Sequence, residues 1–158
     1  MSEERLNAVA WSAREMLEAA FATGDAPSLP WKPNPEDYAT VFTPAVAEGV
    51  KLVYDAMWEE PPELFARPGQ SIVRVQAAWS HEVGNAESAS DFPGGYSQIV
   101  QHLRPHVPWV CFTFTEPGEV IGMAYDGLVY LDGRWVWFPK PWRAIDAWTE
   151  YQAQSADA

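Results

Sequence analysis

Two apolar runs separated by Asp132-Gly133 occupy residues 127–138, and they constrain the fold more than any other segment of the chain. Asp-Gly between alternating apolar residues is the strongest short-range signal for an antiparallel hairpin with a two-residue turn. Such a turn fixes which residues face one another across the hairpin. The expected pairs are Leu131 with Arg134, Tyr130 with Trp135, Val129 with Val136, and Leu128 with Trp137.

Neither face of this hairpin carries the polar residues that a solvated surface would have. The expected register places Leu128, Tyr130, Trp135 and Trp137 on one face, and Val129, Leu131, Val136 and Phe138 on the other. A hairpin that is apolar on both sides must be covered on both sides. Other elements of the chain, or a second copy of it, are therefore expected to pack on each face.

Composition indicates a folded protein with a core of its own. The 158 residues are 47% hydrophobic and include nine tryptophans, which predicts a single domain over residues 1–158 with a frayed tail at 153–158. The single cysteine, Cys111, lies in an apolar run and is expected to be a buried, inert thiol. The sequence has neither a secretory signal pattern nor an apolar run of spanning length, so we expect a cytoplasmic protein without a membrane partner.

The chain is strongly acidic, with a formal net charge of −12. This charge repels phosphate backbones and argues against nucleic-acid binding. It would speed the encounter with a basic protein, although acidic charge also serves solubility alone. The basic cluster of Arg104 with Lys140 through Arg143 is expected to form paired surface charges.

Periodicity and turn signals give the order of elements along the chain. Helices are expected from the Ser2 cap to Gly24, from Asn34 to Phe42, and from Thr43 to Trp58. After a proline-rich linker come a strand at 71–83, a loop at 85–95, a short helix at 96–103 and a hairpin at 109–125. Asp126-Gly127 predicts a kink between the two hairpins, and a terminal helix is expected at 144–152.

This order predicts an α+β fold in which N-terminal helices gather on one face of a curved antiparallel sheet. The long first helix, the bent second helical region and the terminal Leu-Asp-Gly-Arg-Trp-Val-Trp-Phe run resemble the nuclear-transport-factor-two-like superfamily, also called SnoaL-like. The resemblance implies a cone-shaped α+β domain. It also implies frequent homodimers, as well as isomerases and dehydratases that use an Asp or His inside the cone as a general base.

The enzymatic hypothesis centres on His81 together with Asp126, Tyr125 or Asp132. The alternation of residues 71–83 places His81 on the apolar face of its strand, where a pocket base would lie. A histidine satisfied within the core fits the same pattern. Pro105 separates His102 from His106, so no metal site is expected there, and with no phosphate-binding loop either, no cofactor is expected.

Two further interpretations use the aromatic and acidic residues. Trp79, Tyr125, Tyr130, Trp135 and Trp137 could line a ligand cavity at the mouth of the cone, or simply fill the core. Glu59, Glu60, Glu63, Glu87 and Asp91 could contact a basic partner, or form a solvated rim. The sequence favours a non-catalytic, dimeric binding protein, such as an immunity protein that neutralises a basic toxin, over a small-molecule-binding protein or an isomerase or dehydratase.

Overall fold

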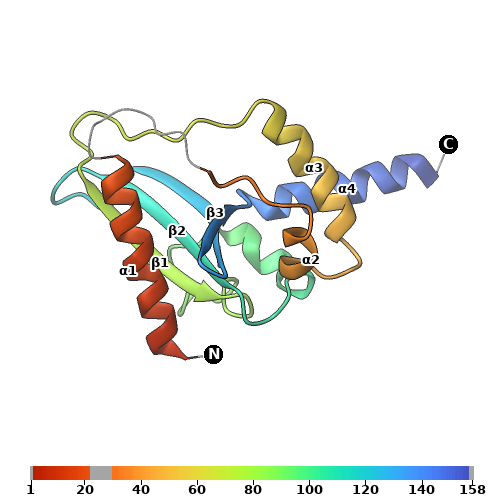
Figure 1. Ribbon diagram of the computed structural model, residues 1–158, viewed down its shortest axis with the longest axis horizontal. Coiled ribbons are helices and arrows are strands. Elements are labelled where there is room, and N and C mark those ends of the chain that lie inside the picture. The colour runs from red at the N-terminus through yellow and green to blue at the C-terminus, as the bar shows by residue number, and fades with distance from the viewer. Residues whose placement is uncertain (1, 22–29, 157–158) are drawn as a thin grey trace.

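A four-stranded antiparallel sheet in the order β1-β2-β3-β4 forms the centre of the protein (Figure 1). The structure is a computed structural model that describes residues 2–21 and 30–156. The strands are β1 (Ile72–Trp79), β2 (Pro108–Thr115), β3 (Met123–Leu131) and β4 (Arg134–Trp137). The helices are α1 (Glu3–Ala20), α2 (Asp37–Val41), α3 (Ala47–Glu59) and α4 (Pro141–Ala156), with the short 3-10 helices η1 (Gly94–Gln98) and η2 (Val100–His102). The predicted α+β class is confirmed.

The hairpin of β3 and β4 has the predicted register. Leu131 faces Arg134, Tyr130 faces Trp135, Val129 faces Val136, and Leu128 faces Trp137. Asp132 and Gly133 make the turn with φ values of 45° and 82°. Both values lie in the left-handed region, as a two-residue turn matched to the twist of the strands requires.

Each face of this hairpin supports a separate hydrophobic core. Val129, Leu131, Val136 and Phe138 pack with residues of α2, α3 and α4, whereas Leu128 and Trp137 pack with residues of α1. The sheet is therefore covered on both sides, as the apolar hairpin predicts. The expectation that the helices gather on one face is wrong, because α1 lies across β1 and β2 on the face opposite the other helices (Figure 1).

Asp126 and Gly127 form the predicted interruption of β3. Val110 of β2 faces Leu128, and Phe112 faces Tyr125, so two residues of β3 stand opposite Cys111 alone. This arrangement is a β-bulge. Gly127 has a φ of 84°, and its carbonyl accepts a hydrogen bond of 2.7 Å from the Phe138 N–H. Cys111 beside the bulge is buried, as predicted, and burial raises the pKa of its thiol.

The helices begin and end close to their predicted positions. The Ser2 hydroxyl accepts a hydrogen bond of 3.1 Å from the Arg5 N–H and caps α1, which ends at Ala20; the predicted end at Gly24 lies outside the described residues. The terminal helix α4 is longer than predicted. It begins at Pro141, because proline suits the first turn of a helix, and it continues to Ala156.

The observed strand β1 is shorter than the strand predicted over 71–83. β1 ends at Trp79, and Ser80 turns the chain, with its N–H and its hydroxyl both donating to the Val107 carbonyl. His81 therefore does not lie on a strand face, which corrects the prediction. Its side chain is 48% exposed, and its Nε2 lies 3.2 Å from Glu82 Oε1. The apolar residue that follows, Val83, is buried within the turn rather than on the strand.

An ion pair ties the α2 segment to the hairpin turn. Asp37 is buried, and its carboxylate accepts a 2.7 Å hydrogen bond from Arg134 as well as one of 2.7 Å from the Asn34 N–H. The hydrogen bond to Asp37 is the main cause of a raised pKa of Arg134. This pairing joins residues far apart in the sequence and holds α2 against the end of the hairpin.

Candidate functional site

A pocket of about 540 Å³ opens where β3 begins. β4 pairs only with residues 128–131, so residues 123–126 of β3 extend beyond it and leave one strand edge uncovered. α3, the linker after it and the start of α4 close around this edge. Apolar side chains line most of the pocket: Val53, Met57, Pro62, Phe65, Met123, Ala124, Trp137, Pro139 and Ala144.

Two tyrosine hydroxyl groups fix the walls of the pocket. Tyr125 on β3 donates to the Phe65 carbonyl at 3.0 Å and accepts from the Phe65 N–H at 3.1 Å, which attaches the linker to the sheet. Tyr54 on α3 donates to the Pro139 carbonyl at 2.9 Å, which attaches α3 to the segment between β4 and α4. Burial raises the pKa of Tyr54, so its hydroxyl stays a neutral hydrogen-bond donor.

Asp126, in the bulge, supplies a buried carboxylate to this pocket. The residue is only 5% exposed, and its Oδ2 accepts hydrogen bonds from the Tyr96 hydroxyl at 2.6 Å and the Lys140 N–H at 3.0 Å. Its backbone carbonyl accepts from Trp137 Nε1 at 2.8 Å. The other carboxylate oxygen, Oδ1, receives no hydrogen bond from the residues that the structure describes. A donor group of a ligand would therefore find a fixed, unoccupied acceptor.

Burial raises the pKa of Asp126 above its ordinary value. The hydrogen bonds from Tyr96 and Lys140 favour the charged form and oppose this rise, as do the positive charges of Lys140 and Arg143. Burial is the largest of these effects, so the carboxylate is a better proton acceptor than an exposed aspartate.

Exposed charges of both signs surround the buried carboxylate at the pocket wall. Lys140 and Arg143 contribute positive charge and Glu63 contributes negative charge. Lys140 has a φ of 47°, an uncommon value for a residue with a side chain, and this conformation directs its backbone N–H to Asp126. The two basic residues, expected to be ordinary surface pairs, thus belong to the pocket.

The structure brings together only some of the residues singled out from the sequence. Asp126, Tyr125, Trp137 and Glu63 line the same pocket. His81 and Asp132 do not line it: His81 lies in the turn after β1, and Asp132 lies in the hairpin turn. Trp79, Tyr130 and Trp135 do not line it either. Tyr130 and Trp135 instead pack against each other, with ring centroids 5.0 Å apart.

Three polar residues that line the pocket, Tyr54, Lys140 and Arg143, were not predicted to act there. Neither was Tyr96, which does not line the pocket but donates to Asp126. Tyr54 and Tyr96 have the pattern of core aromatics, and nothing in their sequence context indicates a hydrogen bond. The only available signal was the position of Lys140 between two prolines, which indicates a rigid turn just after the hairpin. That turn is what places a backbone N–H against Asp126.

The acidic residues proposed to contact a partner fall into two groups. Glu59 and Glu60 are exposed at the end of α3, and Glu63 follows them at the pocket wall. Glu87 and Asp91 are exposed in the segment between β1 and η1, and Asp91 lines a different pocket, beside α1. Only Glu63 and Asp91 line pockets, and the two pockets are different.

Within residues 2–21 and 30–156, no three His, Cys, Asp or Glu side chains come together in a way that would hold a metal ion. In the same part of the chain, no helix has both the length and the apolar character needed to cross a membrane. Comparison with protein families, with curated proteins and with solved structures gave no significant match.

Proposed function

We propose that this protein binds a small amphipathic molecule in the Asp126 pocket. The observation that carries the proposal is a carboxylate that is 5% exposed, held by two donors on one oxygen and left without a partner on the other. A pocket of about 540 Å³ is large enough for a drug-sized ligand. The ligand would place an apolar body against Met57, Met123 and Trp137, and an O–H or N–H donor against Asp126 Oδ1.

The raised pKa of Asp126 also suits proton transfer. A ligand whose acidic proton lies at Oδ1 would lose it to a carboxylate that is more basic than usual, and the apolar walls would exclude water. This chemistry belongs to the isomerase and dehydratase class that the resemblance to the SnoaL-like superfamily implies. It would require Asp126 alone as the base, since His81 does not line the pocket.

Asp126→Asn is expected to weaken binding of a donor ligand at least about tenfold. Tyr96 and Lys140 both donate, so they would retain the amide oxygen and turn the amide NH₂ toward the pocket. The acceptor at the pocket wall then becomes a donor. The probe is 2-naphthol, measured by titration calorimetry against 2-methoxynaphthalene, which has the same apolar body but no donor.

The matched control is Glu63→Gln, which changes an exposed charge at the same pocket. We expect this variant to bind 2-naphthol within about twofold of the unmodified protein. Equal affinity of the unmodified protein for the two probes, or unchanged 2-naphthol binding by Asp126→Asn, would contradict the proposal.

A second candidate function is recognition of a basic protein, such as a toxin that the chain neutralises in the cytoplasm. The supporting observation is the exposed acidic group Glu59, Glu60 and Glu63, near in sequence to Phe65, a residue that is 46% exposed. Charge would speed the encounter and the aromatic ring would anchor the contact. Under this hypothesis, replacing all three glutamates by glutamine lowers the association rate and reduces its dependence on salt.

A further inference from the structure

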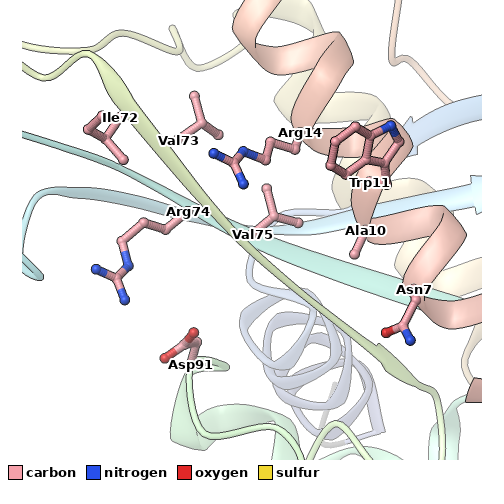
Figure 2. Close-up of a pocket in the computed structure, with 9 residues that line it drawn as sticks. All are labelled: Asn7, Ala10, Trp11, Arg14, Ile72, Val73, Arg74, Val75 and Asp91. Atoms are coloured by element: carbon pink, nitrogen blue, oxygen red, sulfur yellow. The ribbon is translucent and has the colours of Figure 1, made fainter.

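A second pocket, of about 500 Å³, lies between α1 and the outer edge of the sheet (Figure 2). α1 contributes Trp11 and Arg14 to it, β1 contributes residues 72–75, and Asp91 lies on its far side. Trp11 is 62% exposed and is among the largest apolar residues left open to solvent in the described chain. Figure 2 shows Val73 and Val75 pointing toward α1, whereas Arg74 points away from it toward Asp91.

The outer edge of β1 is free to pair with another strand. β1 is the first strand of the sheet and pairs only with β2. The hydrogen bond from the Ser80 N–H to the Val107 carbonyl continues the pairing of β1 with β2. In an antiparallel pair, alternate residues turn their backbone groups toward the partner strand, so residues 72, 74, 76 and 78 turn theirs toward β2. Val73, Val75 and Ala77 are the residues between them, and their N–H and C=O groups point outward. No backbone hydrogen bond to them from outside the sheet is found among the described residues.

We propose that two copies of this chain pair through β1 in antiparallel fashion, about a two-fold axis at Val75. The outward-facing residues must face one another, so Val75 would face the Val75 of the second copy, and Val73 would face Ala77. The two sheets would become one continuous sheet. Because α1 lies on one face near this edge, the two-fold axis would place both α1 helices on the same face, with each exposed Trp11 near the junction.

Charge complementarity selects this register and a second copy as the occupant. An axis at Arg74 would set two arginines directly opposite each other, which is destabilising. With the axis at Val75, Arg74 faces Gln76 of the second copy. Gln76 Oε1 accepts a hydrogen bond of 2.8 Å from the Asp91 N–H, so Asp91 lies beside Gln76. Each Arg74 would therefore meet the Asp91 of the other copy, and the symmetry makes two such pairs.

This pairing overcomes the repulsion between two acidic chains. The net charge of −12 opposes self-association in general. Arg74 and Arg14 line the pocket at the α1 and β1 edge beside Asp91. Arg14 is paired with Glu18 at 2.9 Å, so Arg74 is the positive charge that offsets the repulsion at this edge. The backbone hydrogen bonds of the joined strands and the covered Trp11 side chains supply the remaining attraction.

The test is the mass of the full chain in solution, measured by sedimentation equilibrium with charge-reversed variants. The unmodified protein should have twice the 17.7 kDa mass of one chain. Arg74→Glu and Asp91→Arg should each weaken dimerisation about tenfold or more, and the double variant should restore it. Both side chains are exposed, so these changes should leave folding intact.

Val75→Pro tests the strand pairing itself. Proline removes an N–H that points away from β2, a position where an edge strand tolerates it. The expected result is a folded monomer with unchanged circular dichroism. A monomeric unmodified protein at micromolar concentrations would overturn the proposal. A dimer that survives both single charge reversals would also overturn it. In that case the interface would lie on another surface, or a different partner would pair with the β1 edge.

Discussion

Gly127→Ala is expected to lower the free energy of unfolding by about 3 kcal/mol or more. Gly127 has a φ of 84°, and a left-handed conformation costs about 1–2 kcal/mol for a residue with a side chain. A Cβ atom at this position would also overlap the carbonyl oxygen of Phe138. Gly127 lies within β3 and the carbonyl oxygen belongs to the backbone just after β4, so relief would require the bulge to open. Chemical denaturation monitored by tryptophan fluorescence measures the loss.

Gly118→Ala is the matched control. Gly118 has the same φ of 84°, but nothing lies within 4 Å of the position that its Cβ would take. Only the conformational cost should remain, so we expect a loss of about 1 kcal/mol. The difference between the two variants isolates the close approach of β3 to Phe138. Equal losses in the two variants would mean that the bulge is not packed as described.

Phe138→Ala is expected to cost about 3–5 kcal/mol of stability. Phe138 is fully buried, and its ring packs with ring centroids between 5.3 and 6.2 Å from those of four aromatic residues: Tyr38, Phe42, Tyr54 and Trp109. These rings come from α2, α3 and the sheet, so the cavity would lie where the layers meet. Chemical denaturation at equilibrium measures the change in unfolding free energy.

Phe138→Leu is the control for this variant, because leucine keeps most of the buried volume. We expect it to cost less than half as much as Phe138→Ala. Replacing the exposed Trp11 by alanine or by leucine should leave the unfolding free energy of the monomer almost unchanged. A loss below about 1 kcal/mol for Phe138→Ala would contradict the placement of this ring at the centre of the core.

The hairpin and its bulge could be predicted from the sequence because their signals are local. Asp132-Gly133 specifies the turn, the turn specifies the register, and Asp126-Gly127 interrupts an otherwise apolar strand. The register defines two apolar faces of the hairpin, and other elements must therefore pack on both faces. The sequence did not indicate which helix covers which face. That distribution depends on contacts between residues far apart in the chain, such as α1 with β1.

The end of β1 could not be predicted from alternation alone. Val83 continues the apolar pattern, so His81 appeared to share the face of Trp79. In the structure, the apolar side chain of Val83 enters the same core through a turn instead. The pattern reports burial, and both a strand and a tight turn can bury the same residue. The exposure of His81 follows from that turn.

The candidate site was only partly predictable for a related reason. Asp126 and Tyr125 were identified as possible partners of His81 in a pocket, and Trp137 as one of the aromatic residues that could line a cavity. Tyr96 reaches Asp126 from η1, 30 residues away in the sequence. Lys140 contributes its backbone N–H, which no side-chain motif can indicate. A site built from a bulge, a distant hydroxyl and a main-chain donor leaves little trace in a single sequence.

The central claim is that Asp126 is a buried carboxylate with one oxygen free to meet a ligand, and its titration tests this claim most directly. Because the pKa of Asp126 is raised in the folded protein, protonated Asp126 contributes to the free energy of unfolding, and this contribution is fully present below the ordinary pKa of 3.8. That stability is lost as the pH rises through the folded-state value. The side-chain carboxyl carbon of Asp126 can be followed by NMR and assigned by its absence from Asp126→Asn. We predict a midpoint above 3.8 that falls when 2-naphthol saturates the pocket, because a donor favours the charged form. A midpoint at or below 3.8, or one that 2-naphthol leaves unchanged, would contradict the account.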